Sequence, residues 1–558
     1  MSDSQFQSGY EQCGAGEIVA DDASGIPTRG ENARVEPPGP PPRVPPFDSI
    51  LFEPLCSTIK AEETEPPGFF HDLSLDRIVD AITADWEEYN LKPLYYTRPP
   101  ALGTVQYRQE VMRDLQNRRV LETMKSFSKQ MREMRARLKE ADDAKRYEYP
   151  HAVQKLFLGA VEIYCGAIER LGAELCDHSV TSRGLRAFRE FVAAYLASEA
   201  FQSLTNSARR LTADLSNIRY CILLKNGSVT VRHLEEEEDY STAVEQVFAK
   251  FRSDAPHQYR IEQRRWSGMN HIEAEVQRGV ASLYPETFAA LEAFCVAQAE
   301  YLDATIARFD REIQFYISCL THLEKLRGLG LSFCLPEVSQ SSKEICAKNA
   351  FDLALAWKLA ERGSQVVCND FFLRDPERIL VVSGPNQGGK TTFARMIGQL
   401  HYLASLGCPV PGTAARLFFF DRLLTHFERE ENITTLRGKL QDDLVRIHDI
   451  LAVATSDTLI IMNEMFSSTT LEDALYLSTM VIQKLCRLDL LGVWVTFIDE
   501  IASLNEKTVS IVSNVNPDNP AIRTYKLERR APDGLAYALA IAHKYCMTYG
   551  ALMERIQA

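Results

Sequence analysis

The chain has 558 residues, of which 45% are hydrophobic and 25% charged, a balance typical of a soluble globular protein with roughly two to four domains. Its formal net charge of −14 argues against nucleic-acid binding over the whole surface, although one local basic stripe is compatible with this charge. The 13 cysteines form no C-x-x-C pair, no apolar run reaches about 18 residues, and the N-terminus lacks signal-peptide regions, so we expect a cytoplasmic protein without disulfides, a structural metal or a membrane span.

The first 46 residues have the composition of a disordered tail. They are rich in Gly, Ser, Asp and Glu and end in PPGPPPRVPP, so they bury too little apolar surface to offset the entropy lost on ordering. A Pro-rich ligand for a partner domain is the alternative interpretation of residues 1–46, and a plain linker is the simpler one.

A helical pattern begins at Phe47 and extends to about residue 365. Its first clear helix carries apolar residues at the spacing of one helix face, namely Leu75, Ile78, Val79, Ile82 and Trp86. Two segments without Gly or Pro, residues 104–149 and 286–327, predict unusually long helices. An uninterrupted helix over the second segment would be ~60 Å long at 1.5 Å per residue, the dimension of a lever.

Between these segments lie a predicted hairpin and a basic cluster. The stretch YCILLKNGSVTVR predicts a β-hairpin, because Asn226 and Gly227 readily adopt the positive φ angles of a tight turn. Arg260, Arg264 and Arg265 lie beside a tryptophan and are our candidates for contact with a nucleic-acid backbone. A surface ion-pair network with one anchored tryptophan is the simpler interpretation of the cluster.

From about residue 366 the pattern changes to apolar strands that alternate with helices. The strand candidates are RILVVSGP, TLIIMNE, GVWVTFIDE and RTYKLERR. Because strands separated by helices pair in parallel, region 366–558 predicts an α/β domain with a largely parallel sheet.

A glycine-rich loop follows the first of these strands. The sequence GPNQGGKTT satisfies the phosphate-loop (Walker A) pattern G-x-x-x-x-G-K-[ST] and precedes a helical stretch. Backbone N–H groups of such a loop face phosphate oxygens, Lys390 reaches the β- and γ-phosphates, and the Thr391 hydroxyl is a ligand for Mg²⁺. The predicted nucleotide-binding residues are Gly384, Pro385, Asn386, Gln387, Gly388, Gly389, Lys390, Thr391 and Thr392.

Asn463 and Glu464 end the apolar strand that begins near Leu459. Beside a nucleotide, Glu464 is the candidate catalytic residue that polarises the attacking water, and the Asn463 amide oxygen is a candidate acceptor for a Mg²⁺-bound water without contributing charge. Two polar residues that merely end a strand would be the preferred interpretation if the phosphate loop were absent.

The chain resembles the MutS family of DNA mismatch-repair ATPases in several of these motifs. Its phosphate loop is similar to the family's Gly-Pro-Asn-Met-Gly-Gly-Lys-Ser-Thr loop, and the stretch ILAVATSDTLIIMNE keeps the family's spacing into the second motif. Thr469 and Asp473 fall where the family has Thr and Asp. The stretch RQEVMRDLQ looks like the opening of the family's helical core, and the long helix before residue 328 corresponds to its lever.

Three positions depart from the family's pattern. Asn463 replaces an Asp, Gly438 falls near the serine of the trans-acting signature, and Phe497 replaces a histidine that senses phosphate. A proline-rich tail followed directly by helical core also leaves no room for the family's N-terminal mismatch-recognition domains, so we expect a chain that does not read mismatches itself.

The resemblance implies an α + α/β fold, with a helical lever and clamp region (47–365) followed by an ABC-like ATPase domain (366–558). It also implies ATP and Mg²⁺ as cofactors, a homodimer joined through the ATPase domains, and duplex or branched DNA as partner, with a repair protein as a further partner. The alternative function is a nucleotide-gated protein-binding module whose hydrolysis is very slow. A transporter ATPase fits less well, because no Leu-Ser-Gly-Gly-Gln signature is present.

Overall fold

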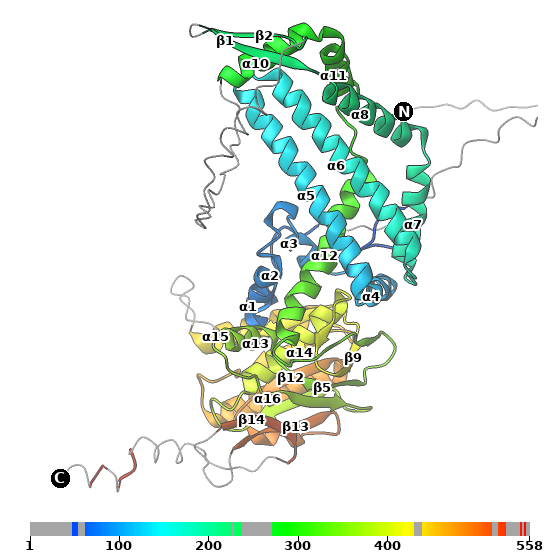
Figure 1. Ribbon diagram of the computed structural model, residues 1–558. Coiled ribbons are helices and arrows are strands. Elements are labelled where there is room, and N and C mark those ends of the chain that lie inside the picture. The colour runs from blue at the N-terminus through cyan, green and yellow to red at the C-terminus, as the bar shows by residue number, and fades with distance from the viewer. Residues whose placement is uncertain are drawn as a thin grey trace, which may run out of the picture. The chain divides into compact units, whose positions relative to one another are not determined.

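The computed structural model describes most of the chain beyond residue 46 (Figure 1). The described residues are 47–53, 62–225, 228–235, 271–428, 438–515, 523–531, 547–549 and 552–553. The predicted disordered tail and the arginine cluster at 260–265 lie outside them.

Helices make up the first half of the described chain. In Figure 1, α5 and α6 lie side by side along their length, and the two helices are in extensive contact. The helices are α1 (Phe69–Leu73), α2 (Leu75–Thr83), α3 (Lys92–Tyr96), α4 (Leu102–Leu115), α5 (Arg118–Arg146), α6 (Pro150–Asp177), α7 (Arg183–Leu196), α8 (Glu199–Ser216), α10 (His271–Leu283), α11 (Pro285–Ala297) and α12 (Ala304–Arg327). No single described helix combines the length and apolar character that a membrane crossing requires; α10 and α11 do so only as a pair bent by 106°.

Both segments predicted as long helices contain one, α5 with 29 residues and α12 with 24, but neither segment forms one uninterrupted helix. The first segment breaks between α4 and α5, where the Asn117 side chain accepts a hydrogen bond from the N–H of Arg119 at 3.0 Å. The second breaks before α12, where the Asp303 carboxylate accepts from the N–H groups of Thr305 at 2.8 Å and Ile306 at 3.0 Å. Asn and Asp are strong N-cap residues, so each one starts a new helix inside a segment without Gly or Pro. With 24 residues, α12 is about 36 Å long rather than ~60 Å.

The predicted hairpin is confirmed. Strands β1 (Tyr220–Lys225) and β2 (Ser228–His233) pair antiparallel, and Lys225 lies opposite Ser228. The two predicted turn residues, Asn226 and Gly227, lie outside the described part of the chain.

The C-terminal half contains the predicted largely parallel sheet. Its strand order is β10-β11-β12-β7-β13-β14, and only β14 runs antiparallel to its neighbour. The strands are β7 (Ile379–Ser383), β10 (Leu423–His426), β11 (Leu459–Asn463), β12 (Leu491–Val495), β13 (Thr508–Val515) and β14 (Arg523–Arg529), and the helices α14 (Lys390–Ser405), α15 (Lys439–Val453) and α16 (Leu471–Leu488) lie between them in sequence.

Continuous apolar runs in the central strands reflect burial of both faces of this sheet. Ile461 belongs to the hydrophobic core that includes the α14 residues, whereas its neighbours Ile460 and Met462 belong to a second core with residues of α16. Successive side chains of a strand point to opposite faces, so a sheet covered on both sides requires apolar residues at every position.

A second sheet crosses the predicted domain boundary at residue 365. It has the order β4-β9-β5-β6, and a separate pair joins β3 to β8. Its elements are β3 (Phe333–Cys334), β4 (Glu337–Ser339), β5 (Ile345–Ala350), β6 (Asn369–Leu373), β8 (Val410–Pro411) and β9 (Ala414–Phe418), with α13 (Leu353–Ala360) between β5 and β6. Strands from both sides of residue 365 therefore share one sheet, and the division into regions 47–365 and 366–558 stays a prediction.

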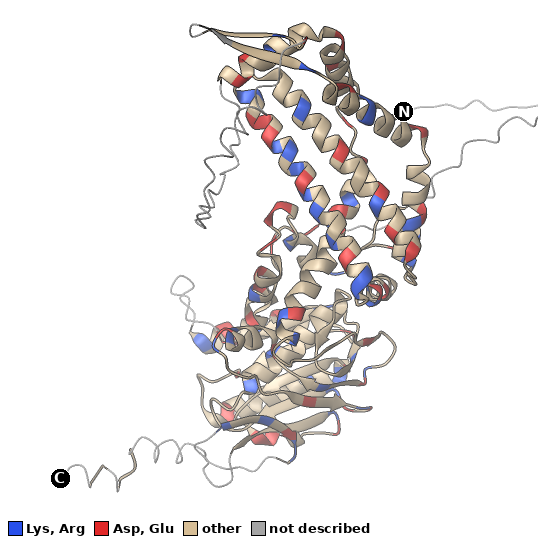
Figure 2. Cartoon of the chain, in the orientation of Figure 1, with Lys and Arg blue, Asp and Glu red and all other residues tan. Residues whose placement is uncertain are grey.

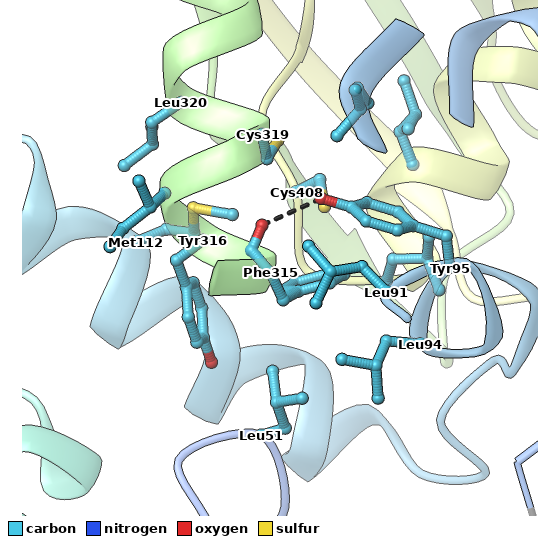
Figure 3. Close-up of a cluster of buried hydrophobic side chains, with 14 of the residues drawn as sticks. Leu51, Leu91, Leu94, Tyr95, Met112, Phe315, Tyr316, Cys319, Leu320 and Cys408 are labelled. Carbon is cyan, nitrogen blue, oxygen red and sulfur yellow. Dashed lines mark hydrogen bonds between the residues drawn. The ribbon is translucent and has the colours of Figure 1, made fainter. Parts of the chain in front are cut away.

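A buried cluster packs α12 against elements far away in sequence (Figure 3). Tyr95 donates a hydrogen bond to the carbonyl oxygen of Phe315 at 2.8 Å, and Cys408, just after α14, lies in the same cluster. Nearby, the fully buried Arg108 donates to the carbonyls of Leu51 at 3.0 Å and Leu406 at 3.2 Å. The helical half and the α14 region therefore share a continuous core.

Residues 47–53 are fastened into this core as a short strap. Ser49 Oγ and the N–H of Ile50 donate to the buried Glu312 carboxylate of α12 at 2.8 and 2.9 Å, and the Tyr107 hydroxyl donates to the carbonyl oxygen of Ser49 at 2.9 Å. Burial raises the pKa of Glu312, because the charged carboxylate loses its hydration.

Candidate nucleotide-binding site

The predicted phosphate loop connects β7 to α14 through a backbone that glycine allows. Gly384 has φ 114° and Gly389 has φ 93°, both in the region that L side chains rarely adopt. A Cβ atom on Gly388 would lie 2.4 Å from Ser513 Oγ, closer than atoms pack. Ser513 in turn donates a hydrogen bond to the carbonyl oxygen of Gly388 at 2.7 Å, so the loop is pressed against β13.

Lys390 begins α14 and folds its ammonium group back over the loop. Nζ donates to the carbonyl oxygens of Gly384 at 2.9 Å and Pro385 at 3.3 Å and to Asn386 Oδ1 at 3.3 Å. Burial lowers the pKa of Lys390, and the Glu464 carboxylate, whose Oε1 lies 3.8 Å away, opposes that effect. A buried cation surrounded mainly by neutral oxygens is poised to bind an anion.

The end of β11 brings Asn463 and Glu464 to this loop. Thr391 Oγ1 donates a hydrogen bond to Asn463 Oδ1 at 2.9 Å, so the two predicted Mg²⁺-associated residues touch. Glu464 leaves the strand with φ 51°, while its N–H still donates to the carbonyl oxygen of Val495 at 3.0 Å. Lys390, Thr391, Asn463 and Glu464 thus meet at one edge of the sheet.

The donor set at this edge fits Mg²⁺ bound together with a nucleotide. A hydroxyl and an amide oxygen are hard oxygen donors, and Mg²⁺ usually retains waters and takes the rest of its ligands from phosphates. Within the described ranges, no group of three or more His, Cys, Asp or Glu side chains is placed to hold a metal by itself. The ion would therefore bind with the nucleotide rather than in a separate protein cage.

A cavity of about 510 Å³ opens beside the loop and has the size of a small-molecule site. The loop residues from Gln387 to Thr392 and Glu464 line one side of it. Residues that the sequence did not predict line the remainder: Phe351, Asp352, Leu355, Leu359, Gln365, Val366, Val367, Asn369, Phe393, Met396 and Tyr525.

Tyr525 is held at the cavity by Asn369 of β6. Asn369 Nδ2 donates to the carbonyl oxygen of Tyr525 at 3.0 Å, and Asn369 Oδ1 accepts from the N–H of Leu527 at 2.8 Å. Tyr525 has φ 58°, which turns its exposed ring toward Gly389. No local motif predicts this arrangement, because the contact joins residues 156 positions apart.

The remaining residues named from the sequence make local contacts, are exposed, or lie outside the described residues. Thr496 is buried and accepts from the N–H of Ile498 at 3.0 Å, whereas the Phe497 side chain is 49% exposed. The N-cap of α16 is Thr470, whose Oγ1 accepts from the N–H of Asp473 at 3.2 Å, and the Asp473 carboxylate accepts from Thr469 Oγ1 at 3.3 Å. The candidate DNA contacts Arg260, Arg264 and Arg265 lie outside the described residues.

A mostly parallel sheet with a strand–glycine loop–helix unit at the cavity places the C-terminal half in the class of α/β nucleotide-binding proteins. Residues 380–545 match MutS domain V, the ATPase domain of its family, and residues 101–329 match the MutS2 N-terminal domain. The chain belongs to the MutS family.

Curated relatives carry the same family names. The chain is 32% identical over 187 residues to Endonuclease MutS2 of Thermus thermophilus and 30% identical over 190 residues to Endonuclease MutS2 of Gemmatimonas aurantiaca, stretches that cover 32% and 33% of this chain. It is 27% identical over 159 residues, or 28% of its length, to the human DNA mismatch repair protein Msh3. The matches cover 24%, 23% and 14% of these relatives, so the chain spans about a quarter of their length or less.

Proposed function

We propose that the chain is a MutS-type, DNA-binding ATPase that binds ATP with Mg²⁺ at residues 384–392. The observation that carries this proposal is the meeting of Lys390, Thr391, Asn463 and Glu464 beside one cavity of nucleotide size. Glycine N–H groups and the N-terminus of α14 bind phosphate oxygens, and Lys390 exchanges its carbonyl partners for the β- and γ-phosphates.

Hydrolysis requires that a water be oriented toward the γ-phosphate. Glu464 is the residue for this step, because its carboxylate lies 3.8 Å from Lys390 Nζ at the phosphate end of the cavity. Thr391 and Asn463 would hold Mg²⁺, which neutralises phosphate charge when bound. Asn463 supplies no negative charge, so we expect slower hydrolysis than an aspartate at this position would give.

A homodimer through the nucleotide-binding half is part of the proposal. Large apolar side chains are strongly exposed in the single chain on α16 (Leu471, Tyr476 and Met480) and after β12 (Phe497). Exposed apolar groups of this kind mark contact surfaces, and they lie on elements that follow the Asn463-Glu464 pair. In the dimer, the helical halves enclose DNA as a clamp.

DNA recognition in this proposal rests on backbone contacts rather than on mismatches. The chain's similarity to DNA mismatch repair protein Msh3 and to Endonuclease MutS2 supports DNA as the partner class. Arg260, Arg264 and Arg265 are the proposed contacts to phosphates, and a repair protein is a further proposed partner.

The second candidate function is a nucleotide-gated module that binds a protein and hydrolyses ATP very slowly. The neutral Asn463 and the apolar, exposed Phe497 favour it, because neither side chain supplies a negative charge or an acid–base group for hydrolysis.

Measurement of ATP turnover with and without matched, mismatched and branched DNA separates the two functions. A MutS-type ATPase is expected to turn over ATP and to respond to DNA, whereas the gated module is expected to bind ATP with negligible turnover under every condition. The Lys390→Ala variant is the background control. Turnover equal to that control, together with no DNA binding, would overturn the leading proposal.

A further inference from the structure

Helix α13 connects the nucleotide cavity to the long helix α12. Asp352 at its N-terminus and Leu355 in its first turn line the cavity. Further along, α13 contacts α12, α2 and α14. Helix α13 therefore lies between the nucleotide cavity and helices α12 and α2 of the helical half.

The cavity end of α13 is fixed by a buried carboxylate. Asp352 is 1% exposed and accepts three hydrogen bonds, from the N–H of Leu355 at 2.9 Å, from Arg395 Nε at 2.5 Å and from Gln399 Nε2 at 3.0 Å. Arg395 and Gln399 both lie on α14, the helix that begins with the phosphate-binding Lys390. A buried charge with several bonds resists displacement, so α13 and α14 move together.

Gln399 extends this connection to the helical half. Its Oε1 accepts from the N–H of Leu353 at 2.8 Å, and its Nε2 also donates to the carbonyl oxygen of Leu73 at 2.9 Å. Gln399 is fully buried, so both contacts are shielded from water. One α14 side chain therefore bonds to α13 and to the C-terminal residue of α1.

The opposite face of α13 contacts α12 through an aromatic stack, whereas Leu355 and Leu359 line the nucleotide cavity. The rings of Trp357 and His322 have centroids 4.3 Å apart and an interplanar angle of 25°. Burial lowers the pKa of His322 to about 4, so its ring is neutral at pH 7. A cavity of about 180 Å³ lies beside the stack, so the contact is not packed on every side and has room to shift.

We propose that α13 transmits nucleotide occupancy to α12, with Asp352 as the positioning residue at the cavity and Trp357 as the contact with α12. The proposal rests on nucleotide binding at the site described above. An 8-residue helix is one stiff unit about 12 Å long, so a displacement of its cavity-lining face by bound nucleotide also displaces Trp357, on its opposite face, against His322.

Hydrogen exchange of the full chain tests this link. Amide exchange in α14 and α12 is measured with and without Mg²⁺ and the non-hydrolysable analogue adenosine 5′-(β,γ-imido)triphosphate. We expect the analogue to change exchange in both helices of the wild type by about twofold or more. In Trp357→Leu, the change in α14 is expected to persist and the change in α12 to disappear. Lys358→Ala, an exposed neighbour on α13, is the matched control and is expected to behave as the wild type.

The outcomes distinguish this link from nucleotide binding itself. No change in α14 of the wild type would remove the nucleotide site and the link together. A change in α14 without one in α12, or a full response of α12 in Trp357→Leu, would overturn the link alone. His322→Leu removes the same contact from the α12 side and is expected to give the same loss, which guards against a folding defect in one variant.

Asp352→Asn tests the positioning residue. The amide keeps an acceptor for the N–H of Leu355 but removes the charge opposite Arg395. We expect the Kd for Mg²⁺·ATP to rise about tenfold in this variant, and Arg395→Gln to add little in the double variant, because the two residues act as one pair. A purely structural role predicts a lower Tm with unchanged Kd, and this result would overturn the assignment.

Discussion

Lys390 and Glu464 occupy the same corner of the nucleotide cavity and have opposite charges. Within the part of the chain that the structure describes, the Lys390 ammonium donates hydrogen bonds to carbonyl and amide oxygens, and its carboxylate neighbour Glu464 lies 3.8 Å away. Burial removes water from this ammonium group, and the phosphate oxygens of a nucleotide are the acceptors best suited to replace that water.

Replacement of Lys390 by Ala removes this fixed cation. We expect nucleotide binding to be lost or ATP turnover to fall about 100-fold or more, because loop N–H groups alone neutralise phosphate charge incompletely. Equilibrium binding of ATP and steady-state turnover measure the two effects. Wild-type affinity and turnover in Lys390→Ala would rule out the proposed phosphate site.

Asn463 is one of the three positions that differ from the motif pattern of the family that the sequence resembles. Asn463→Asp places a carboxylate beside Thr391 Oγ1, and we expect Mg²⁺ affinity or ATP turnover to rise roughly 5- to 30-fold, the ratio that 1 to 2 kcal/mol gives. Magnesium titrations of ATP turnover measure the change. Glu464→Gln is the companion variant and is expected to bind ATP but not to hydrolyse it. If Asn463→Asp changes neither quantity, the amide is no handicap to hydrolysis.

At the scale of elements, the strand and loop predictions succeeded because their signals are local. The buried strands β7, β11 and β12 are short apolar runs, and the loop between β7 and α14 is defined by glycine spacing. The helix breaks at Asn117 and Asp303 were not predicted, because the two long helices were inferred from the absence of Gly and Pro alone. Both residues are N-caps, a residue type that does carry a sequence signal for the start of a helix.

The cavity wall could not be predicted from the sequence for a different reason. Asp352 and Tyr525 reach the loop through contacts with Arg395 and Asn369, which are 43 and 156 positions away. Nothing in the neighbouring residues of either side chain encodes such a contact. Tertiary packing decides it.

The contact between α12 and α5 makes stability depend on pH. Asp310 of α12 pairs with Arg135 of α5, yet burial outweighs this guanidinium and raises the pKa of Asp310 from 3.8 to about 6. A carboxyl group with a higher pKa in the folded chain holds its proton more tightly there, so its contribution to the free energy of unfolding falls as pH rises from about 4 to about 6.

Asp310→Asn removes this titration. Between pH 4 and pH 7, we expect the free energy of unfolding of the wild type to fall relative to that of the variant by up to about 3 kcal/mol, the value of roughly two pKa units. Urea unfolding of both proteins at the two pH values measures it. Asp143→Asn, which alters an exposed α5 ion pair, is the control and should show no such change. A difference between wild type and Asp310→Asn that does not vary with pH would contradict the assignment.

At the scale of the whole molecule, both signs of charge are interspersed along the long helices α5 and α6 (Figure 2). Basic residues outnumber acidic ones on α5 and acidic ones outnumber basic ones on α6, while the net charge of the chain is −14. Binding of DNA therefore has to come from a local cluster, and the basic cluster at 260–265 is our candidate.

We predict sequence-independent DNA binding that weakens steeply with salt and shows little preference for a mismatch. Replacement of Arg260, Arg264 and Arg265 by Ala should weaken binding to all duplexes and flatten the salt slope by up to about three units, one for each phosphate neutralised. Titrations of matched and mismatched duplexes over a range of salt concentrations measure both effects, and DNA-free ATP turnover of the triple variant should match the wild type. Mismatch-selective binding, or binding indifferent to salt and to the substitutions, would refute the prediction.

The strap at residues 47–53 affects how the protein is made on the ribosome. Ser49 is synthesised 263 residues before its hydrogen-bond partner Glu312. Arg108 is synthesised 298 residues before Leu406, whose carbonyl oxygen accepts a hydrogen bond from it. The helical layer around α4 therefore cannot close during synthesis of its own sequence, and its apolar faces stay open until α12 and the residues after α14 have left the exit tunnel. We therefore expect exposed apolar surface on the nascent chain until α12 is synthesised, and we expect a chain truncated before residue 304 to aggregate more readily than the full chain.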